Sequence, residues 1–326
     1  MISKERLMSQ LDNCLLEAEY EQWKAFYSHG KVRDFYRMPG KRILITTDRQ
    51  SAFDRILGAI PLKGQVLNHI SCWWFEKTRD IVKNHLLEVP DPNVSVVREV
   101  RIFPVEIVVR GYITGTTDTS AWVNYEQGVR EFCGVHLPEG LRKNQQFEAP
   151  IITPTTKAES GHDEKISPNE IIEGGLVPEE TWHKIEQIAL DLFERGTEVS
   201  ARNGLILVDT KYEMGETEDG EIVVADEVHT PDSSRFWIKD TYKTRFARDQ
   251  EPESLDKEFL RLWLKEKGIS ETYLPDLDDE IRVEVAQRYI DLFERVTGET
   301  FTVENLDTPV KERIEGNIAK YFSSGP

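Results

Sequence analysis

The chain has 326 residues and a formal net charge of −18 at pH 7, so its surface repels nucleic acid and anionic lipid, and we expect neither as a partner. Hydrophobic residues make up 39% of the chain, which is enough for a core, and no apolar run approaches the roughly 18 residues of a membrane span. The N-terminal stretch has no signal-peptide pattern, and Cys14, Cys72 and Cys133 form neither a disulfide framework nor a metal site. A cytoplasmic protein is therefore expected.

The first third of the chain is predicted to be rich in strands. Residues 5–27 have the periodicity of an amphipathic helix, and residues 64–86 have that of a second helix. Strands are expected where β-branched residues are concentrated, at 42–47, 94–97 and 105–109.

The rest of the chain is predicted to combine one hairpin with several helices. Residues 138–178 contain five prolines and are expected to form a loop. A strong helix should follow over 178–204, and then a β-hairpin with strands at 205–213 and 221–226. The tail is expected to be helical and to serve packing, with helices at 255–267, 279–297 and 303–322.

The stretch LVDTKYEMG places Asp209, Lys211 and Glu213 two residues apart. Alternate side chains of a strand leave the same face, so the three should project together. Two carboxylates beside one ammonium can bind a cation and an anion at once, as a Mg-nucleotide requires. The alternative is an exposed strand face with an ordinary ladder of ion pairs.

The stretch ADEVHTPDSSRFW is dense in hydrogen-bonding groups. Asp226 ends the strand that pairs with the one bearing Glu213, and two carboxylates roughly 5 Å apart favour a Mg²⁺ ion between them. Asp232 and the two serines after it are expected to cap their own turn, which leaves Arg235 free to bind a carboxylate or a phosphate. The alternative is a self-capped loop with Trp237 in the core.

Two further stretches suggest anion binding. In GKVRDFY, Gly30 starts a turn whose Lys31 and Arg33 can lie over a triphosphate, although a Gly-Lys pair is common in ordinary turns. In VVRGYITGTTDTSAW, Arg110 ends a buried strand before a loop rich in Gly, Ser and Thr. Such a loop is either a seat for a phosphate or carboxylate or a flexible surface loop.

Lys157 and the pair His162–Asp163 stand in a segment with proline and threonine, where a lone histidine is usually a surface residue. The sequence contains no dinucleotide-binding glycine motif, no Walker loop and no serine elbow, which argues against those folds and against acyl-enzyme chemistry. Together the motifs indicate a Mg-nucleotide enzyme that acts on an anionic small molecule. The alternatives are a small-molecule kinase on a related fold and a nucleotide-sensing module without turnover.

Seven stretches resemble, in chain order, the signatures of the SAICAR synthetase family in its longer form. They lie between about residue 30 and residue 240 and read GKVRDFY, TTDRQSAFD, IPLKGQVLNHIS, VEIVVRGYITG, TPTTKAESGHDE, LVDTKYEMG and ADEVHTPDSSRFW. The resemblance implies a carbon–nitrogen ligase of purine biosynthesis. Such an enzyme uses ATP and Mg²⁺ to join the carboxylate of carboxyaminoimidazole ribotide to the amine of L-aspartate.

The resemblance also implies an α+β fold with two lobes, similar to kinases and ATP-grasp enzymes. Residues 1–104 would form a sheet-rich ATP lobe, and residues 105–326 a larger α/β lobe with a helical tail. The expected partners are the small-molecule substrates, and the protein is expected to be a monomer or a small homo-oligomer.

The family's site residues can be carried over motif by motif. The catalytic residues would be Lys31, Asp209 and Lys211. The nucleotide and its Mg²⁺ would contact Gly30, Lys31, Arg33, Arg98, Arg101, Phe103, Glu213 and Asp226, the last two as metal ligands. The ribotide would contact Arg110, Lys157, His162, Asp163, Lys211, Asp232, Ser234 and Arg235. The loop GTTDTSAW is longer than the family pattern, so either Thr116 or Ser120 would take the phosphate contact; we prefer Thr116, which directly follows Gly115.

Overall fold

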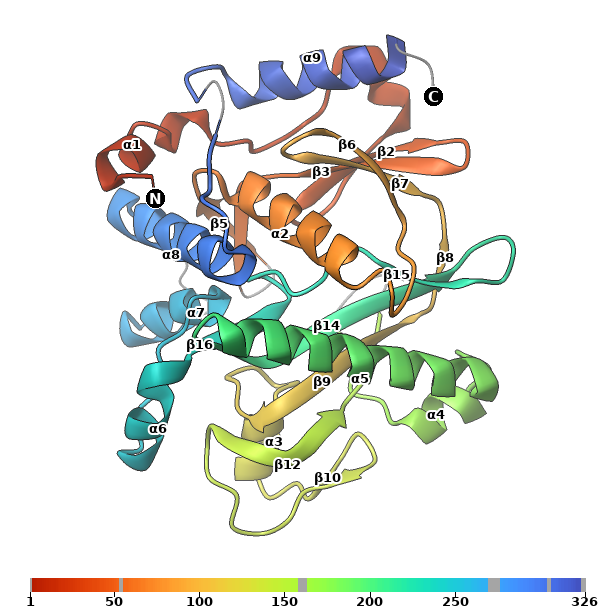
Figure 1. The fold of residues 1–326 in the computed structure, drawn as a ribbon, viewed down its shortest axis with the longest axis vertical. Helices are drawn as coiled ribbons and strands as arrows, with labels where there is room; N and C mark the ends of the chain where they lie inside the picture. The colour runs from red at the N-terminus through yellow and green to blue at the C-terminus, as the bar shows by residue number, and fades with distance from the viewer. Residues whose placement is uncertain (1, 53–54, 158–162, 269–275, 304–305, 324–326) are drawn as a thin grey trace. The chain divides into compact units, whose positions relative to one another are not determined.

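The computed structural model describes residues 2–52, 55–157, 163–268, 276–303 and 306–323 (Figure 1). Its contacts divide the chain into two compact units. The first unit contains Met1–Trp73, His85–Glu99 and Phe259–Pro326, and the second contains Trp74–Asn84 and Val100–Glu258. The chain changes unit after Glu99, close to the boundary expected at residue 104. The helical tail, expected in the second lobe, belongs to the first unit.

In the described part of the first unit, a five-stranded antiparallel sheet has the order β1-β2-β3-β7-β6. Its strands are β1 (Tyr27–His29), β2 (Arg33–Met38), β3 (Lys41–Thr46), β6 (Leu86–Asp91) and β7 (Val94–Arg98). Ile43 and Ile45 of β3 pair with Val96 and Val94 of β7, and all four lie in one core. The strands predicted at 42–47 and 94–97 are confirmed. The predicted turn at Gly30 is present, and strand β2 follows it from Arg33. This strand was not predicted, because its buried face carries Asp34, a residue type usually found at the surface.

The helix predicted over residues 5–27 is wrong. The segment contains helix α1 (Lys4–Met8) and two 3₁₀ helices, Leu11–Asn13 and Glu21–Phe26. Two of its backbone amides donate to buried carboxylates instead: Leu15 N to Asp48 Oδ2 at 2.7 Å, and Ala18 N to Asp34 Oδ2 at 2.8 Å. These tertiary bonds take the place of the i to i−4 bonds of a helix.

The remaining elements of the first unit are a hairpin and helices. They are β4 (Arg49–Ala52), β5 (Arg55–Ala59), α8 (Asp279–Thr297) and α9 (Val310–Ser323), together with most of α2 (Lys63–Lys77) and of α7 (Lys257–Glu266). Helix α8 begins at the Asp278 side chain, which accepts from Ile281 N, and ends at Gly298 in the left-handed conformation, as helix ends favour. Arg313 of α9 lies 3.0 Å from Asp91 of β6, so the tail packs as predicted, although on the sheet of the first unit.

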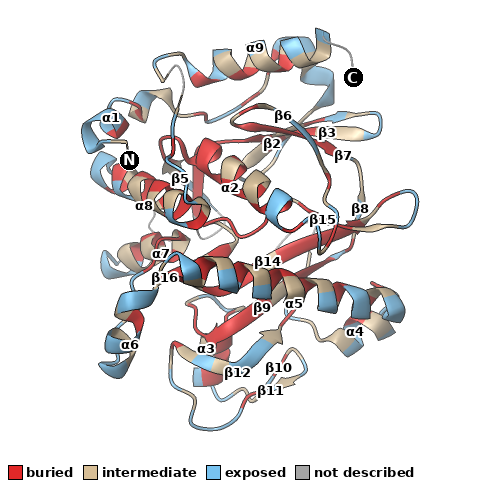
Figure 2. Ribbon diagram, viewed as in Figure 1, coloured by how far each residue is buried: buried red, intermediate tan, exposed pale blue. Residues whose placement is uncertain are grey.

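In the described part of the second unit, a seven-stranded sheet is built around β14 (Leu205–Glu216). Strand β14 pairs with β9 (Val105–Ile113), β15 (Ile222–Ala225), β16 (Ser234–Ile238) and β8 (Arg101–Ile102), while β12 (Gln145–Ile152) and β13 (Thr155–Thr156) pair with β9. Helix α5 (Glu179–Arg202) packs on β14 and β9 with a buried stripe that includes Trp182, Ile185, Leu192 and Phe193. The sheet's central strands are buried along most of their length (Figure 2).

Residues 138–178, predicted as a loop, contain β12, β13 and helix α4 (Pro168–Glu173). Pro150 is tolerated in β12 because this strand lies at the sheet edge and its register shifts between Gln146 and Ile151. Helix α4 starts with a reciprocal cap between Ser167 and Glu170. The predicted helices over 64–86 and 178–204 and the hairpin at 205–226 are confirmed in type, with the bounds given above.

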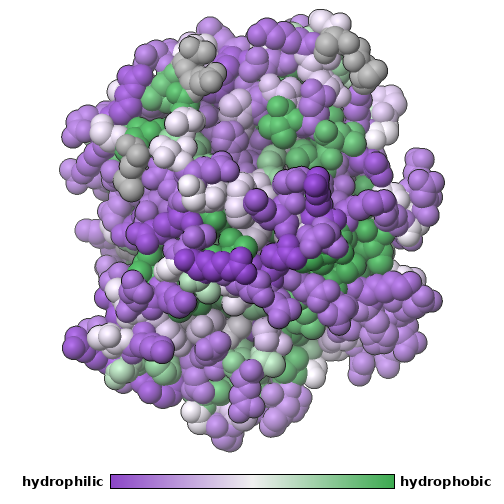
Figure 3. Space-filling model, in the orientation of Figure 1, coloured by the Kyte–Doolittle hydropathy of each residue, from purple (hydrophilic) through white to green (hydrophobic). Residues whose placement is uncertain are grey.

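The other elements of the second unit are short. They are α3 (Ala121–Glu126), β10 (Glu131–Phe132), β11 (Val135–His136) and α6 (Lys239–Ala247). Across the described residues, no helix is both long enough and apolar enough to cross a membrane. Hydrophilic side chains cover most of the face seen in Figure 3, in agreement with the net charge of −18.

Candidate functional site

Strand β14 presents Lys211 and Glu213 on one face and Tyr212 on the other. Lys211 Nζ lies 2.6 Å from Glu106 Oε1 of β9 and 3.5 Å from Glu213 Oε1, and Lys157 Nζ binds the other oxygen of Glu213. Although burial alone lowers the pKa of the Lys211 ammonium, the charges of Glu213, Glu106 and Asp226 together raise it above its ordinary value. We call these five residues, Glu106, Lys157, Lys211, Glu213 and Asp226, the carboxylate cluster.

Asp226 does not lie opposite Glu213 as predicted. Glu213 pairs with Ala225, the last residue of β15, and Asp226 follows the strand with a left-handed φ of 62°. Aspartate tolerates this backbone conformation better than most residues. The two carboxylates are therefore offset by one position along the hairpin, yet both act electrostatically on Lys211.

The carboxylate cluster has the donor chemistry of a magnesium site. Glu213 and Asp226 offer carboxylate oxygens, and Mg²⁺ in nucleotide enzymes is commonly held by one or two carboxylates, with the phosphates and water completing its shell. Among the described residues, no three His, Cys, Asp or Glu side chains form a ready metal cage. The donor set of two carboxylates fits a Mg²⁺ ion only where a nucleotide and water supply the rest of the shell.

Glu106 was missed by the sequence analysis. Burial raises the pKa of its carboxyl group, and Lys211 opposes that rise. The signal for it in the sequence is VEIVV, in which one carboxylate interrupts a buried strand and therefore requires a neighbouring cation.

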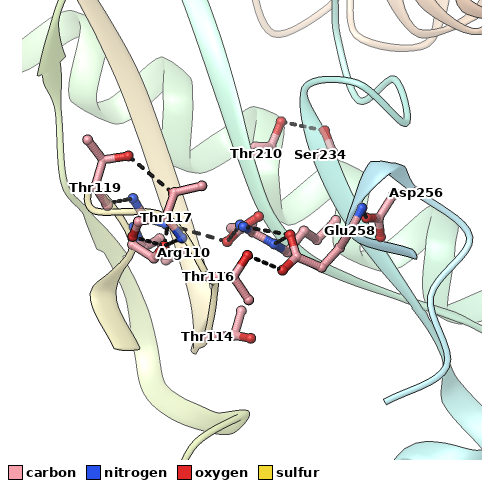
Figure 4. Close-up of polar contacts among 12 residues, drawn as sticks. Arg110, Thr114, Thr116, Thr117, Thr119, Thr210, Ser234, Asp256 and Glu258 are labelled. Atoms are coloured by element: carbon pink, nitrogen blue, oxygen red, sulfur yellow. Dashed lines mark hydrogen bonds and ion pairs between the residues drawn. The ribbon is translucent and has the colours of Figure 1, made fainter. Parts of the chain in front are cut away.

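The second group of charged side chains joins β9, β14, β16 and the start of α7 (Figure 4). Arg235 Nη1 donates to Asp209 Oδ2 at 2.7 Å, and Arg110 Nη1 lies 3.5 Å from the same oxygen. Arg235 also donates through Nε and Nη2 to Glu258 Oε2 at 3.3 and 3.2 Å. Arg235 is therefore paired, not free as predicted. We call Arg110, Asp209, Arg235 and Glu258 the arginine cluster.

The two guanidinium groups respond differently to their surroundings. Burial lowers the pKa of Arg110, and Asp209 opposes this effect. Burial also works against the charge of Arg235, but Asp209, Glu258 and Asp256 outweigh it and raise its pKa. Both groups are cations at neutral pH, so both can bind a phosphate.

The loop after β9 reaches the arginine cluster through its hydroxyl groups. Thr116 Oγ1 donates to Glu258 Oε1 at 2.7 Å, and Ser120 Oγ accepts from Thr117 N at 2.7 Å. Gly115 has a φ of 106°, and a Cβ there would stand 2.6 Å from Ser120 Oγ and 3.2 Å from Arg235 Nη2. Both candidate hydroxyls thus lie near Arg235, and the choice between them stays a prediction.

The loop before β16 caps itself, as predicted, but around Thr230. Thr230 Oγ1 accepts from Asp232 N and Ser233 N, each at 3.3 Å. Ser234 is buried, and its hydroxyl lies 2.7 Å from that of Thr210. Trp237 packs in the core against Tyr112 and Tyr242, as the alternative interpretation of this stretch expected.

His229, a residue the sequence analysis did not single out, anchors the same loop. Its Nε2 lies 2.5 Å from the Tyr212 hydroxyl, and its ring meets the edge of Trp74. A Cβ on Gly196 of α5 would stand 2.4 Å from His229 Cε1, so the helix admits the ring only because residue 196 is a glycine. His229 lies between Asp226 and Asp232 in the chain and holds that segment against the sheet.

In the first unit, the predicted phosphate turn is built around Arg49. Gly30 N donates to Arg33 O at 2.9 Å, which closes the turn that carries Lys31. The Arg49 guanidinium donates to the carbonyls of Gly30 and Lys31 at 2.9 and 3.1 Å, and to Asp34 Oδ1 at 2.7 Å. Arg49 was missed because its role depends on contacts between distant strands.

The remaining predicted residues are dispersed. Arg98 ends β7. Arg101 of β8 forms an ion pair with Glu216 of β14, and the buried Phe103 donates its backbone amide to Met214 O. Asp163 is exposed, and its charge adds to the rise in the pKa of Glu106. His162 lies outside the described residues.

Comparisons with known proteins agree with the family inferred from the sequence. The family model of SAICAR synthetase matches residues 26–275. A phosphoribosylaminoimidazole-succinocarboxamide synthase of Legionella pneumophila is 52% identical over 311 residues, which cover 95% of this chain and 99% of that protein. The SAICAR synthase of Saccharomyces cerevisiae, solved in complex with SAICAR, superposes with a TM-score of 0.75 at 31% identity and covers 88% of this chain and 100% of its own.

A SAICAR synthetase solved in complex with ADP is also similar, with a TM-score of 0.65 at 26% identity over 85% of this chain and all of its own. The predictions of an α+β fold of this kind and of the family are confirmed by these matches. The chain belongs to the SAICAR synthetase family.

Proposed function

We propose that this protein is an ATP-dependent ligase of purine biosynthesis. It joins the carboxylate of carboxyaminoimidazole ribotide to the amine of L-aspartate and gives SAICAR, ADP and phosphate. Family membership over most of the chain supports this reaction, and an ADP complex of a similar protein supports ATP as the nucleotide.

The arrangement of β14 carries the proposal. Asp209, Lys211 and Glu213 belong to one strand, with steps of roughly 7 Å for every two residues. Asp209 forms ion pairs with Arg110 and Arg235, whereas Lys211 and Glu213 belong to the carboxylate cluster. The arginine cluster, which suits an anion, and the carboxylate cluster, which suits a Mg-nucleotide, therefore lie next to each other along β14.

The arginine cluster is suited to the ribotide phosphate. Arg110 and Arg235 provide two guanidinium groups, and Thr116 or Ser120 provides a hydroxyl. Asp209 lies within ion-pair distance of both arginines through one carboxylate oxygen and so orients them. The other predicted ribotide contacts are assigned to the sugar, base or carboxylate: Lys157, His162, Asp163, Lys211, Asp232 and Ser234.

The carboxylate must be activated before an amine can attack it. An oxygen of the ribotide carboxylate attacks the γ-phosphorus of ATP, ADP leaves, and an acyl phosphate forms. The aspartate amine, once deprotonated, attacks the acyl carbon, and inorganic phosphate leaves with the oxygen it received. Holding the three reactants in place should supply much of the rate.

Lys211 stays an ammonium group during this sequence. Its raised pKa makes it unable to accept the amine proton at neutral pH, so it stabilises negative charge on the reacting carboxylate or phosphoryl group. Glu213 and Asp226 would hold Mg²⁺, which neutralises phosphate charge when bound. Lys31 and Arg33 are assigned to the triphosphate, and Arg98, Arg101 and Phe103 to the rest of the nucleotide.

The metal assignment is tested by replacing Glu213 with glutamine. We expect Glu213→Gln to lower Mg²⁺-dependent turnover by about a hundredfold or more, because the substitution removes a charged oxygen ligand but keeps the side-chain shape. Turnover is measured as ADP release, which should require both the ribotide and L-aspartate. ADP release with an unrelated alcohol in their place would instead favour a kinase.

The matched control is Glu221→Gln at the turn of the same hairpin. Glu221 pairs with Lys83 at an exposed position outside the proposed site, and its substitution should leave turnover within about twofold of wild type. Circular dichroism checks that both variants fold. Near-wild-type activity of a folded Glu213→Gln protein would remove Glu213 from the metal site.

We also infer a cytoplasmic location and a monomer or small homo-oligomer. The three cysteines form no disulfide, which agrees with a reducing compartment. Fractionation of cells and light scattering of the purified protein test the two statements.

A further inference from the structure

The arginine cluster already contains its own anions. In the second unit, Arg110 and Arg235 carry two positive charges, and Asp209 and Glu258 carry two negative charges within ion-pair distance of them. All four side chains are largely buried. A phosphate that enters this group therefore meets guanidinium groups that are already paired, and it must compete with a carboxylate.

Asp256 adds further negative charge beside Arg235. Its two carboxyl oxygens accept from Phe236 N and Glu258 N, each at 2.7 Å. Burial raises the pKa of this carboxyl group to about 7, although the two amides and Arg235 oppose the rise. Asp256 is thus fixed by the backbone and is not available to move.

Asp209 is equally fixed. It lies in the middle of β14, and its backbone pairs with Arg110 on one side and Arg235 on the other. The short side chain is gripped by both arginines. Moving its carboxylate would require moving the central strand of the sheet.

Glu258 is the anion that can leave. It stands in the first turn of α7 and reaches Arg235 through a longer side chain with one more rotatable bond than aspartate. One carboxylate oxygen accepts from the Arg235 fork at 3.2 and 3.3 Å, and the other accepts from Thr116 Oγ1 at 2.7 Å. These are long charged contacts, compared with the 2.7 Å that joins Arg235 to Asp209.

Two partners of Glu258, the Arg235 guanidinium and the Thr116 hydroxyl, are groups that also bind phosphate. A guanidinium fork and a threonine hydroxyl both donate to one planar anion, as Figure 4 shows for Thr116 and Glu258. A phosphate in the same place would accept the same hydrogen bonds and bring a larger charge. We propose that Glu258 is a resident anion, which occupies the phosphate-binding groups of Thr116 and Arg235 and is displaced when the ribotide phosphate binds. This inference rests on the proposed function for the identity of the phosphate.

The opposite role for Glu258 is a purely structural one. If Glu258 only orients Arg235 for the substrate, its carboxylate remains in place in the complex, and removing its charge weakens phosphate binding. If Glu258 is displaced, removing its charge takes away a competitor and strengthens phosphate binding. The sign of the change therefore separates the two roles.

The experiment measures binding of ribose 5-phosphate to the full chain by calorimetry, without ATP or L-aspartate. We expect Glu258→Gln to lower the dissociation constant by about tenfold, because a like charge next to the bound phosphate is removed. Unchanged or weaker binding overturns the proposal, and so does the absence of ribose 5-phosphate binding in both proteins. The readout does not depend on turnover, so a failure of the ligase assay with intact binding would count only against the proposed reaction.

The matched control is Glu251→Gln. Glu251 is ion-paired with Lys143 and bonded to Asn144 in the same unit, so the variant loses one carboxylate charge without touching the arginine cluster. Its dissociation constant should stay within about twofold of wild type. An equal gain in both variants would show a general charge effect and overturn the specific role of Glu258.

A second measurement covers the case in which Glu258→Gln does not fold. In a crystal structure of the wild-type protein with ribose 5-phosphate, we expect the Glu258 carboxylate to have left Arg235 and the Thr116 hydroxyl to donate to the phosphate. A bound phosphate beside an intact Arg235–Glu258 ion pair would overturn the proposal.

Discussion

At the scale of single residues, Gly196 decides whether helix α5 can lie against His229. A Cβ at this position would come within 2.4 Å of the His229 ring and 2.6 Å of Leu207 Cδ2. The sequence predicted the helix that carries Gly196, but it contained no sign of the His229 ring packed against it. Side-chain contacts across a core depend on the full three-dimensional packing, which periodicity does not encode.

We therefore expect Gly196→Ala to destabilise the protein. The overpacking should lower the free energy of unfolding by roughly 1–3 kcal/mol, in spite of the higher helix propensity of alanine. Urea denaturation followed by tryptophan fluorescence measures the change.

Gly316 of α9 offers a matched control for this substitution. It is also a helical glycine, but a Cβ there would meet nothing within 4 Å. Gly316→Ala should be neutral or stabilising by up to about 1 kcal/mol. Equal destabilisation by both substitutions would contradict the packing argument.

His229 makes stability depend on pH. Burial lowers its pKa to about 3, so the folded protein keeps the ring neutral while the unfolded chain protonates it below about pH 6.5. Protons therefore bind the unfolded state preferentially as the pH falls, and stability decreases. Above the unfolded pKa the ring is neutral in both states, so this contribution to the pH dependence disappears.

The expected loss from this one group is about 2 kcal/mol between pH 6.5 and pH 5. The free energy of unfolding measured at both values should fall less in His229→Asn than in wild type. If the two proteins lost stability equally over this interval, His229 would not be the titrating group.

At the scale of elements, two signals in the sequence were reliable. The concentration of β-branched residues located β3, β7 and β9, and alternation along β14 predicted correctly that Lys211 and Glu213 share a face. Register was less accessible at β15, because all four of its residues, Ile222–Ala225, are apolar and show no alternation that would fix the pairing. Asp226 was therefore expected opposite Glu213, whereas β15 ends one residue earlier.

The turn between β1 and β2 shows why parts of the site could not be predicted. Its backbone is held by Arg49, whose guanidinium donates to Leu16 O at 2.5 Å in addition to the carbonyls of Gly30 and Lys31. The motif at the turn was visible, but the residue that holds it lies on another strand. Glu106, His229 and Glu258 were missed for the same reason.

We expect Arg49→Lys to destabilise the first unit. Lysine keeps the charge but cannot reproduce a planar fork that serves three carbonyls and Asp34. Leaving buried acceptors without donors should cost roughly 2–4 kcal/mol. Chemical denaturation measures the loss, and the KM for ATP should rise because the Lys31 turn loses its support.

The control is Arg79→Lys. Arg79 is exposed and forms an ion pair with Glu76, which is also exposed. It should change neither stability nor KM by more than experimental error. Wild-type stability of Arg49→Lys would show that the fork is not what holds the turn.

At the scale of the whole molecule, the sequence led to the family and the fold class but not to the division of the chain. The resemblance to the family implied a tail in the second lobe, whereas the contacts of the described residues place it in the first unit. The sequence predicted helices in the tail, but it did not indicate which sheet their apolar faces cover. Val310, Ile314 and Ile318 in fact complete the core of the first unit, together with Leu15 and Tyr20.

This return of the tail has a consequence for protein synthesis. Asn13 near the start of the chain accepts from Val310 N at 2.9 Å and donates to Leu306 O and Thr308 O, so the first unit joins segments almost three hundred residues apart. During translation, all of Val100–Glu258 is synthesised before α8 and α9. The second unit can therefore fold on the nascent chain, whereas the first must wait, with part of its apolar surface exposed to solvent, until α8 and α9 have been made.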